Sequence, residues 1–307
     1  MTVILTGTSG FIGSYLLKND LVTKAVIRSN RELEKKGNLK THVVTSIDSS
    51  TNWKGAFESI DCVIHLAGLA HRKTFTVDDY NEVNVKGTLH LARQAAKNGI
   101  KRFIFVSSIG VNGTSTYESP FEYDSLPSPH NAYAQSKYDA ECGLKKIAQE
   151  TGLEVVIVRP TLVYGPEAPG NFGMLTKLVN KLPFLPFGLT NNRRDFIAVQ
   201  NLADLLLTCA SHPDAAGHTF LASDGETVSI KQFTNAIADG LGKKVIQLPV
   251  PVSLMRLVGK LTGKSVMIEQ LYGNLEVDSS NIKEVLGWTP PLTMKKAMST
   301  LCDSGVK

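Results

Sequence analysis

Tyr133 and Lys137 have the residue types and the spacing that proton transfer requires. Residues four apart on a helix lie on one face, one turn from each other. A lysine ammonium in that position is expected to lower the pKa of the phenol, which a tyrosine needs in order to pass a proton near neutral pH. Because this spacing is common, it indicates catalysis only together with the elements that position the pair.

Three glycines at the start of the chain predict a turn that binds a dinucleotide. Gly7, Gly10 and Gly13 follow Val3–Leu5, a short apolar run typical of a central parallel strand, and open a segment with helical spacing. Glycine is needed where the turn is tight, where backbone approaches a pyrophosphate, and where helix packs on strand. We expect Phe11 and Ile12 to take part in the same site. The alternative is a strand-to-helix turn without a ligand.

The residue after the second apolar run, Lys24–Ile27, indicates which dinucleotide is bound. An acidic residue there would bond to a ribose 2′-hydroxyl, whereas an arginine suits a 2′-phosphate. Arg28, with Ser29 and Arg31 beside it, therefore favours NADP, with NAD as the other possibility. A solvated basic loop would explain the same residues without a ligand.

Composition is that of a globular enzyme. The chain has 307 residues, 42% of them hydrophobic and 20% charged, and a net charge of +5 with scattered lysines and arginines. This charge does not indicate a nucleic-acid partner but suits an anionic small molecule. The four cysteines lie far apart without a CxxC pair, as expected for free thiols in a reducing cytosol. We see no signal peptide and no apolar stretch of about 18 residues, so we expect a cytoplasmic protein without a membrane span.

Strands alternate with helices in the first half of the chain. Helices are predicted near Val77–Asn98 and Tyr133–Glu150, between apolar runs at Val3–Leu5, Lys24–Ile27, His42–Thr45, Cys62–Leu66, Arg102–Val106 and Glu154–Val158. Such alternation predicts an α/β fold: a doubly wound parallel Rossmann sheet covered on both faces. We assign residues 1–160 to this dinucleotide-binding core. Residues 161–307, rich in proline and glycine at first, form mainly a smaller substrate-binding region, with some segments returning to the core.

One late segment, Val250–Leu271, carries apolar residues with Arg256, Lys260 and Lys264 among them. A membrane-surface helix has this composition. Prolines and glycines interrupt the segment, however, and favour a packed or lid-like helix.

Ten motifs are spread over nearly the whole chain. They are Thr6-Gly-x-x-Gly-x-x-Gly13, Val63-Ile-His-Leu-Ala-Gly68, Asn84-Val-x-Gly-Thr88, Phe103-x-x-Val-Ser-Ser108, Tyr133-x-x-x-Lys137, Arg159-Pro160, Val163-Tyr-Gly-Pro166, Arg194-Asp-Phe-Ile-x-Val199, Asn201-Leu-Ala-Asp204 and Leu286-Gly-Trp-x-Pro290. Together they resemble the extended short-chain dehydrogenases/reductases that act on nucleotide sugars. Within that family the chain is similar to bacterial UDP-glucose 4-epimerase-like proteins of surface-polysaccharide clusters, some of which are 4-ketoreductases.

The resemblance implies roles for individual residues. Tyr133 would be the general acid/base at the sugar C4 oxygen, Lys137 would bind the nicotinamide ribose, and Ser108 would hydrogen-bond the same sugar oxygen. Ser107 is the alternative to Ser108, one position away. Further cofactor contacts would come from Ile47, Leu66, Ala67, Gly68 and Pro160. Substrate contacts would come from Asn171, Phe172 and Arg194, the last gripping the diphosphate unless it pairs with Asp195. No metal site is expected.

Three departures from the family pattern bear on the reaction. Ile109 and Gly110 stand where dehydratases carry an acidic pair, so dehydration is disfavoured. Arg28 replaces the aspartate of NAD-retaining epimerases, and Ser46 replaces an aspartate near the adenine. A second diphosphate-binding arginine has no clear counterpart before Val277-Asp278.

The favoured interpretation is a UDP-sugar 4-ketoreductase of the UDP-2-acetamido-2,6-dideoxy-4-keto-hexose type, because Arg28 suits an NADPH that arrives and leaves. A UDP-glucose or UDP-GlcNAc type 4-epimerase uses the same residues and is the first alternative. A catalytically silent NADP-binding regulator and a reductase of hydrophobic ketones are more distant ones. Family relatives often form homodimers through the helices around Thr88–Lys97 and Tyr133–Glu150, and the spacing permits this here.

Overall fold

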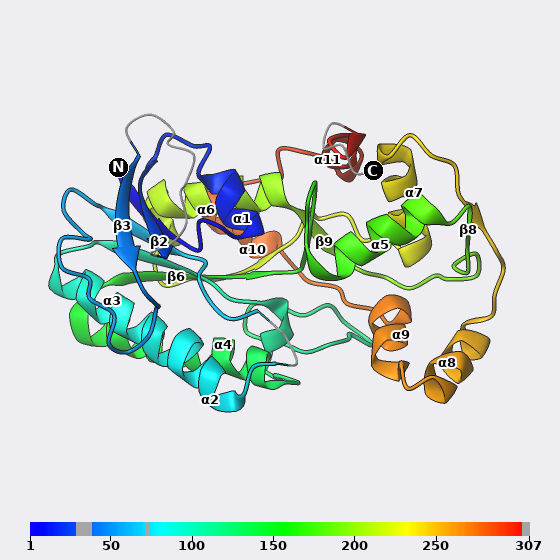
Figure 1. The fold of residues 1–307 in the computed structure, drawn as a ribbon, viewed down its shortest axis with the longest axis horizontal. Coiled ribbons are helices and arrows are strands. Elements are labelled where there is room, and N and C mark those ends of the chain that lie inside the picture. Colours follow the sequence, from blue (N-terminus) through cyan, green and yellow to red (C-terminus); the bar gives the residue numbers. More distant parts are fainter. Residues whose placement is uncertain (29–38, 71–73, 303–307) are drawn as a thin grey trace.

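The computed structural model describes residues 1–28, 39–70 and 74–302. At its centre lies a parallel sheet of seven strands in the order β3-β2-β1-β4-β5-β6-β10 (Figure 1). The order reverses between β1 and β4, as in doubly wound dinucleotide-binding folds. This confirms the predicted fold class. The strands are β1 (Val3–Thr6), β2 (Val22–Arg28), β3 (Lys40–Val44), β4 (Cys62–His65), β5 (Arg102–Val106), β6 (Glu154–Pro160) and β10 (Thr219–Ala222).

Both faces of the sheet are buried because successive side chains of each strand point to opposite faces. On one face, Ile4 and Val63 pack under α3 (Thr88–Lys97) and α4 (Ala132–Thr151). On the other face, Leu5 and Ile64 pack under a second helical layer. That layer consists of α1 (Phe11–Leu16), α6 (Val199–Ser211) and α10 (Ser280–Leu286) (Figure 1).

The helix predicted near Val77–Asn98 is present but irregular. It begins as α2 (Val77–Tyr80), continues as a π-helical segment over Asn81–Gly87, and ends as α3. At Gly87 a Cβ atom would lie 2.7 Å from the carbonyl oxygen of Ile47, so only glycine lets the helix approach the end of β3 this closely. Wider winding at this point is common near functional sites.

Residues after Pro160 build most of a second region around an aromatic cluster, in which the rings of Phe196 and Phe233 stack with centroids 3.7 Å apart. Segments α6, β10 and α10 lie against or within the main sheet instead. The second region comprises β7 (Leu162–Tyr164) paired with β9 (Phe196–Ala198), β8 (Phe184–Leu185) paired with β11 (Ile246–Gln247), and the helices α5 (Gly170–Lys181), α7 (Ile230–Gly240), α8 (Val252–Leu261), α9 (Ser265–Tyr272) and α11 (Met294–Ser299).

Two short 3₁₀ turns complete the described elements, at Ile109–Val111 and Pro213–Ala215. Within the described ranges, none of the helices combines the length and the apolar composition that crossing a bilayer requires.

Candidate active site

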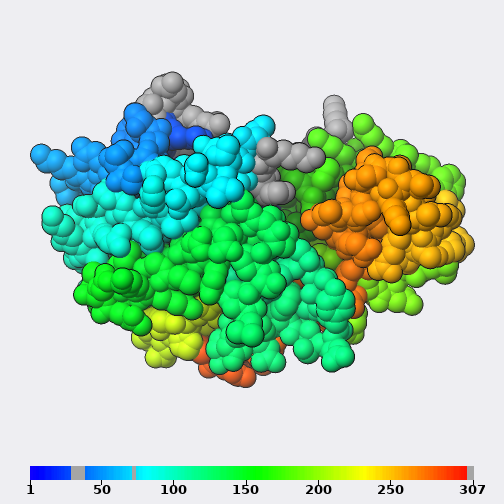
Figure 2. Space-filling model, turned by 90° about the horizontal axis from the view of Figure 1, so that it is seen from below, coloured from blue at the N-terminus to red at the C-terminus, as the bar shows by residue number. Residues whose placement is uncertain are grey.

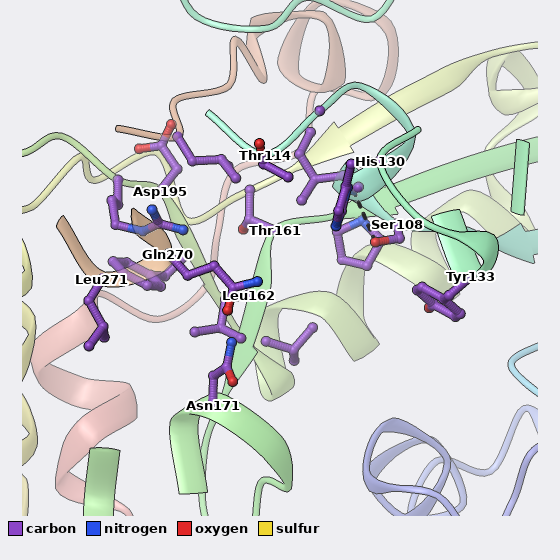
Figure 3. Close-up of a pocket in the computed structure, with 18 of the residues that line it drawn as sticks. Ser108, Thr114, His130, Tyr133, Thr161, Leu162, Asn171, Asp195, Gln270 and Leu271 are labelled. Carbon is purple, nitrogen blue, oxygen red and sulfur yellow. Dashed lines mark hydrogen bonds between the residues drawn. The ribbon is translucent and has the colours of Figure 1, made fainter. Parts of the chain in front are cut away.

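A cavity of about 640 Å³ lies where the carboxyl ends of the sheet strands meet the second region. Parallel sheets bind ligands at this edge, where the strand order reverses. Figure 3 shows Ser108, His130 and Tyr133 on one side of the cavity and Asn171, Gln270 and Leu271 on the other. Most of the lining is apolar. Polar side chains that reach it include Ser108, Thr114, His130, Tyr133, Lys137, Thr161, Asn171, Arg194, Asp195 and Gln270.

Ser108 stands just beyond β5 and both caps a turn and lines the cavity. Its hydroxyl accepts a hydrogen bond from the backbone N–H of Gly110 at 3.1 Å. The hydroxyl proton stays available to an oxygen in the cavity, because a serine can accept and donate at once. Ser107 also lines the cavity, and its buried hydroxyl has no hydrogen-bond partner among the described residues. The choice of Ser108 over Ser107 therefore stays a prediction.

Tyr133 lies in the first turn of α4. The helix begins here because the side chain of Asn131 accepts a hydrogen bond from the backbone N–H of Ala134 at 2.8 Å. Tyr80, from α2, packs edge-on against the Tyr133 ring with centroids 6.2 Å apart. The cap and this ring contact together fix the phenol at the wall of the cavity.

Lys137 is buried one turn further along α4. Its ammonium donates a hydrogen bond to the carbonyl oxygen of Val106 at 3.0 Å and lies 4.7 Å from the centre of the Phe105 ring. Burial lowers the lysine pKa to about 8, and the nearby Glu141 carboxylate acts in the opposite direction. Glu141 is itself held by Arg159 in a buried two-pronged ion pair, whose shorter N–O distance is 2.5 Å. Lys137 therefore exchanges its proton at a pH close to the physiological range.

The expected lowering of the Tyr133 pKa is wrong for this structure. Burial raises the pKa of Tyr133 to about 12, and Tyr80 adds to the increase. Lys137 does not reverse this, because its ammonium is bonded to Val106. The phenol is therefore protonated at neutral pH, which is the state that a proton donor requires.

The turn after β1 requires glycine because backbone atoms pack closely around it. Gly7 has φ +73°, and a Cβ there would lie 2.8 Å from the backbone nitrogen of Ala67. The Gly10 N–H donates to the Gly7 carbonyl at 3.0 Å, and a Cβ on Gly13 would collide with that same carbonyl. Ile12 lines the cavity, whereas the Phe11 ring packs edge-on against Tyr15.

The end of β4 lies between this turn and Lys137. Leu66 lines the cavity, and the Ala67 N–H donates to the Thr6 hydroxyl at 3.2 Å. At Gly68 a Cβ would lie 3.0 Å from the side-chain oxygen of Asn84 and 3.5 Å from the Lys137 ammonium. Gly7 and Gly68 thus leave bare backbone between the glycine turn and Lys137, which is what an extended dinucleotide would require.

His65 is a positioning residue that the sequence did not single out. Its two ring nitrogens bond to the hydroxyls of Thr6 at 2.7 Å and Thr88 at 2.9 Å, which ties β1, β4 and α3 together. Complete burial lowers its pKa to about 3, so the ring is neutral.

The expected cofactor-selecting residues lie at the ends of β2 and β3. Arg28 is the last residue of β2 and is exposed; Ser29 and Arg31 lie outside the described residues. Ile47 is half-buried beyond β3. Ser46 donates its hydroxyl to Asp48, and this bond, with others from Ser50, lowers the Asp48 pKa. The ionised carboxylate of Asp48 therefore lies near the end of β3, two positions after Ser46, where the family pattern has its aspartate.

Arg194 lines the cavity without an ion pair among the described residues. Its guanidinium donates to the carbonyl oxygen of Gly273 at 2.9 Å. Burial lowers its pKa to about 10, which leaves it charged at neutral pH. Asp195 instead accepts hydrogen bonds from the Thr227 hydroxyl at 2.6 Å and the Val277 N–H at 2.7 Å. The structure therefore does not contain the Arg194–Asp195 ion pair that was the alternative expected from the sequence.

Of the neighbours Asn171 and Phe172 in α5, only Asn171 reaches the cavity. The Phe172 ring is buried between Tyr164 and Phe233, with centroids 5.8 and 5.9 Å away. Adjacent helix residues point about 100° apart, so one faces the ligand and the other the core. The expected substrate contact by the Phe172 ring is thus not found. Pro160, at the end of β6, does line the cavity.

Several cavity residues were missed because no motif carries them: Thr114, His130, Met174, Met267 and Gln270. Met267 and Gln270 belong to α9, and their only sequence signal was the amphipathic segment Val250–Leu271. No group of three or more potential metal-binding side chains occurs in the part of the chain that the structure describes.

Comparison with known proteins agrees with this geometry. A model of the NAD dependent epimerase/dehydratase family matches residues 3–223. A relative from Vibrio cholerae, named UDP-glucose 4-epimerase, is 41% identical over 306 residues, which cover 96% of this chain and 92% of the relative.

Two solved structures share the fold. The UDP-glucose 4-epimerase of Thermotoga maritima, solved with UDP-glucose, covers 99% of this chain and 98% of its own with a TM-score of 0.75 and 22% identity. RMD from Pseudomonas aeruginosa, solved with NADPH, covers 99% of both chains with a TM-score of 0.71 and 20% identity. The family match over most of the chain and the Vibrio relative lead to one conclusion: the chain belongs to the NAD-dependent epimerase/dehydratase family, with the fold of the extended short-chain dehydrogenases/reductases.

Proposed function

We propose that this chain is a nicotinamide-dependent oxidoreductase acting at C4 of a UDP-hexose. The observation that carries the proposal is the meeting of Ser108, Tyr133 and Lys137 with Arg194 in one cavity. Two hydroxyls and an ammonium suit proton transfer at a sugar oxygen, and a guanidinium suits a diphosphate. The Vibrio cholerae relative named UDP-glucose 4-epimerase supports the same class of substrate.

The bound nicotinamide would supply or accept the hydride. Tyr133 would give its phenolic proton to the C4 oxygen during reduction and take a proton from it during oxidation. The raised pKa of Tyr133, about 12, keeps the phenol protonated at neutral pH, as the donating direction requires. Ser108 would donate a hydrogen bond to the same oxygen as negative charge develops there. Lys137, whose ammonium is charged below about pH 8, would bind the nicotinamide ribose.

The favoured reaction is reduction of a UDP-2-acetamido-2,6-dideoxy-4-keto-hexose with NADPH. Arg28 supports this choice, because an exposed arginine at the end of β2 suits the 2′-phosphate of a cofactor that must exchange at every turnover. Dehydration is disfavoured, since Ile109 and Gly110 follow Ser108 and neither offers a carboxylate.

A 4-epimerase is the second candidate, and the 41% identical relative favours it. An epimerase keeps its cofactor, whereas a reductase releases it. The purified protein should therefore be denatured and the released nicotinamide identified by absorbance and mass. An empty site that binds NADPH more tightly than NADH supports the reductase. Stoichiometric NAD in the purified protein contradicts it and directs the work to inversion of UDP-hexoses.

Binding of UDP alone separates these two reactions from a reductase of hydrophobic ketones and from a silent regulator. A reductase of hydrophobic ketones has no use for a diphosphate site, and a silent regulator needs no complete set of Ser108, Tyr133 and Lys137. Free UDP should raise the melting temperature through Arg194. A melting temperature that UDP does not change would favour the reductase of hydrophobic ketones.

We further propose a homodimer formed through α3 and α4, which lie side by side on one face of the sheet. Sedimentation velocity at micromolar concentration should show twice the chain mass. A monomer under those conditions would rule the dimer out.

A further inference from the structure

Helix α8 carries an apolar stripe that faces outward. Leu254, Leu257, Val258 and Leu261 are all exposed, Leu261 by 78%. Their spacing places them on one face of the helix, which is the arrangement that ordinarily packs against a core. Here the inward positions are taken by other residues: Gly259 is buried, and Met255 packs against the aromatic cluster.

Helix α9 extends the same surface. Val266 is 74% exposed and Met267 43%. The two helices pack closely, since a Cβ on Gly259 would lie 2.7 Å from the Ile268 side chain. Figure 2 shows them, in orange, as a bulge at one end of the molecule. We call Leu254, Leu257, Val258, Leu261, Val266 and Met267 the α8–α9 face.

Basic side chains lie on the same two helices. Helices α8 and α9 and the residues between them, Val252–Tyr272, contain Arg256, Lys260 and Lys264 and one acidic residue, Glu269. Glu269 is already engaged in a two-pronged ion pair with Arg256, at 2.8 and 3.1 Å. Lys260 and Lys264 are exposed beside the apolar stripe.

The α8–α9 face is continuous with the mouth of the cavity. Met267 belongs to the face and also lines the cavity, together with Gln270 and Leu271 one turn further along α9. Met174 of α5 also lines the cavity and is exposed. A partner bound to the α8–α9 face would therefore lie next to the cavity.

We propose that the α8–α9 face docks on a membrane surface that contains anionic lipid. Leucine, valine and methionine side chains would enter the boundary between headgroups and acyl chains, and Lys260 and Lys264 would meet lipid phosphates. An uncharged protein partner would not require these two exposed cations. Docking in this orientation would place the cavity mouth at the level of the headgroups. The inference does not depend on which C4 reaction the site performs.

The test is flotation of the full chain with vesicles of phosphatidylcholine alone or with about 30% phosphatidylglycerol. We expect binding to the anionic vesicles that weakens as salt is added. The double variant Leu257→Ser/Leu261→Ser should reduce the partition coefficient by about tenfold or more. Lys260→Gln/Lys264→Gln should reduce it about 30-fold, because each of the two cations near an anionic surface adds about 1 kcal/mol.

Leu126→Ser is the matched control, since Leu126 is 89% exposed and lies outside the α8–α9 face. It should float as the wild type does, and all variants should keep the melting temperature of the wild type. No flotation of the wild-type protein, equal flotation with neutral and anionic vesicles, or equal loss in Leu126→Ser would each overturn the proposal. So would a self-association in solution that Leu257→Ser/Leu261→Ser abolishes while flotation stays unchanged.

Discussion

The two sides of the cavity are built differently. On the side that we propose to be catalytic, the first turn of α4 and the end of β5 hold their polar groups through backbone bonds. Lys137 bonds to the Val106 carbonyl, Ser108 accepts from the Gly110 N–H, and Asn131 caps the helix start. On the substrate side, α5 and α9 contribute mostly apolar side chains, and the Arg194 guanidinium is bonded to the single carbonyl of Gly273.

We expect the first side to determine which reaction occurs and the second side to determine which substrate binds. Backbone bonds and the buried sheet hold these groups in a fixed geometry, which proton transfer requires because small displacements are costly for catalysis. Side chains that line an apolar wall can change with little effect on the fold. We therefore expect substitutions on the catalytic side to affect turnover, and substitutions on the substrate side to affect affinity.

The largest effect is expected for Tyr133→Phe. Removing the phenolic hydroxyl removes the proton donor, so kcat should fall about 10³-fold or more, while cofactor affinity, measured by fluorescence titration, should stay nearly unchanged. Tyr138→Phe, on the same helix but outside the cavity lining, is the control and should keep near-normal activity. Turnover retained in Tyr133→Phe would remove Tyr133 from the mechanism.

Lys137→Met should separate activity from stability. The substitution should abolish turnover yet raise the free energy of unfolding at pH 7 by at most about 3 kcal/mol, because burial holds the lysine pKa near 8 instead of 10.5. The lost hydrogen bond to the Val106 carbonyl reduces this gain. The gain should be complete below pH 8 and disappear toward pH 10.5, where the unfolded chain also loses this proton. Denaturant unfolding at several pH values measures it. Lys145→Met, at an exposed position of α4, should change stability by less than about 0.5 kcal/mol. An equal gain in both variants would contradict the account.

Arg194→Ala should weaken UDP binding by about 10- to 100-fold, as expected for the loss of a charged hydrogen-bond donor, with a smaller change in kcat. Isothermal titration calorimetry measures the affinity. The neighbouring Arg193 offers a matched control, since it is exposed and paired with Glu276 at 2.7 Å outside the cavity. If Arg193→Ala weakens UDP binding as much as Arg194→Ala does, the effect is one of general charge and not of a diphosphate site.

A smaller effect is expected at the other end of the dinucleotide site. Arg28→Asp should shift the ratio of kcat/KM for NADPH over NADH toward NADH by about tenfold, because a carboxylate repels a 2′-phosphate and accepts a bond from a 2′-hydroxyl. Arg93→Asp, an exposed arginine of α3, should leave the ratio unchanged. No change in Arg28→Asp would mean that Arg28 is only a surface charge.

The catalytic side was predictable from sequence because its groups sit at fixed offsets from strand ends and helix starts. Tyr133 and Lys137 share one helix, and Ser108 follows a buried strand. The direction of the Tyr133 pKa was not predictable, because it depends on where the Lys137 ammonium points and on Tyr80, which comes from another helix. The π-helical turn over Asn81–Gly87 likewise depends on tertiary contact with the end of β3.

The substrate side was less predictable, because it too depends on how helices are oriented in the folded chain. Asn171 and Phe172 are neighbours in sequence, and only the orientation of α5 decides which of them meets the cavity. Val250–Leu271 was expected to be one packed or lid-like helix; it is two helices, with part of its apolar surface turned outward.

The most direct measurement of the central claim is to follow a deuterium atom. The protein would be incubated with a UDP-2-acetamido-2,6-dideoxy-4-keto-hexose and NADPH deuterated at C4 of the nicotinamide, and the product analysed by mass spectrometry and NMR. We predict one deuterium at C4 of the sugar with the wild-type protein and none with Tyr133→Phe. Deuterium at another carbon, or a reduced sugar without deuterium, would contradict hydride transfer to C4.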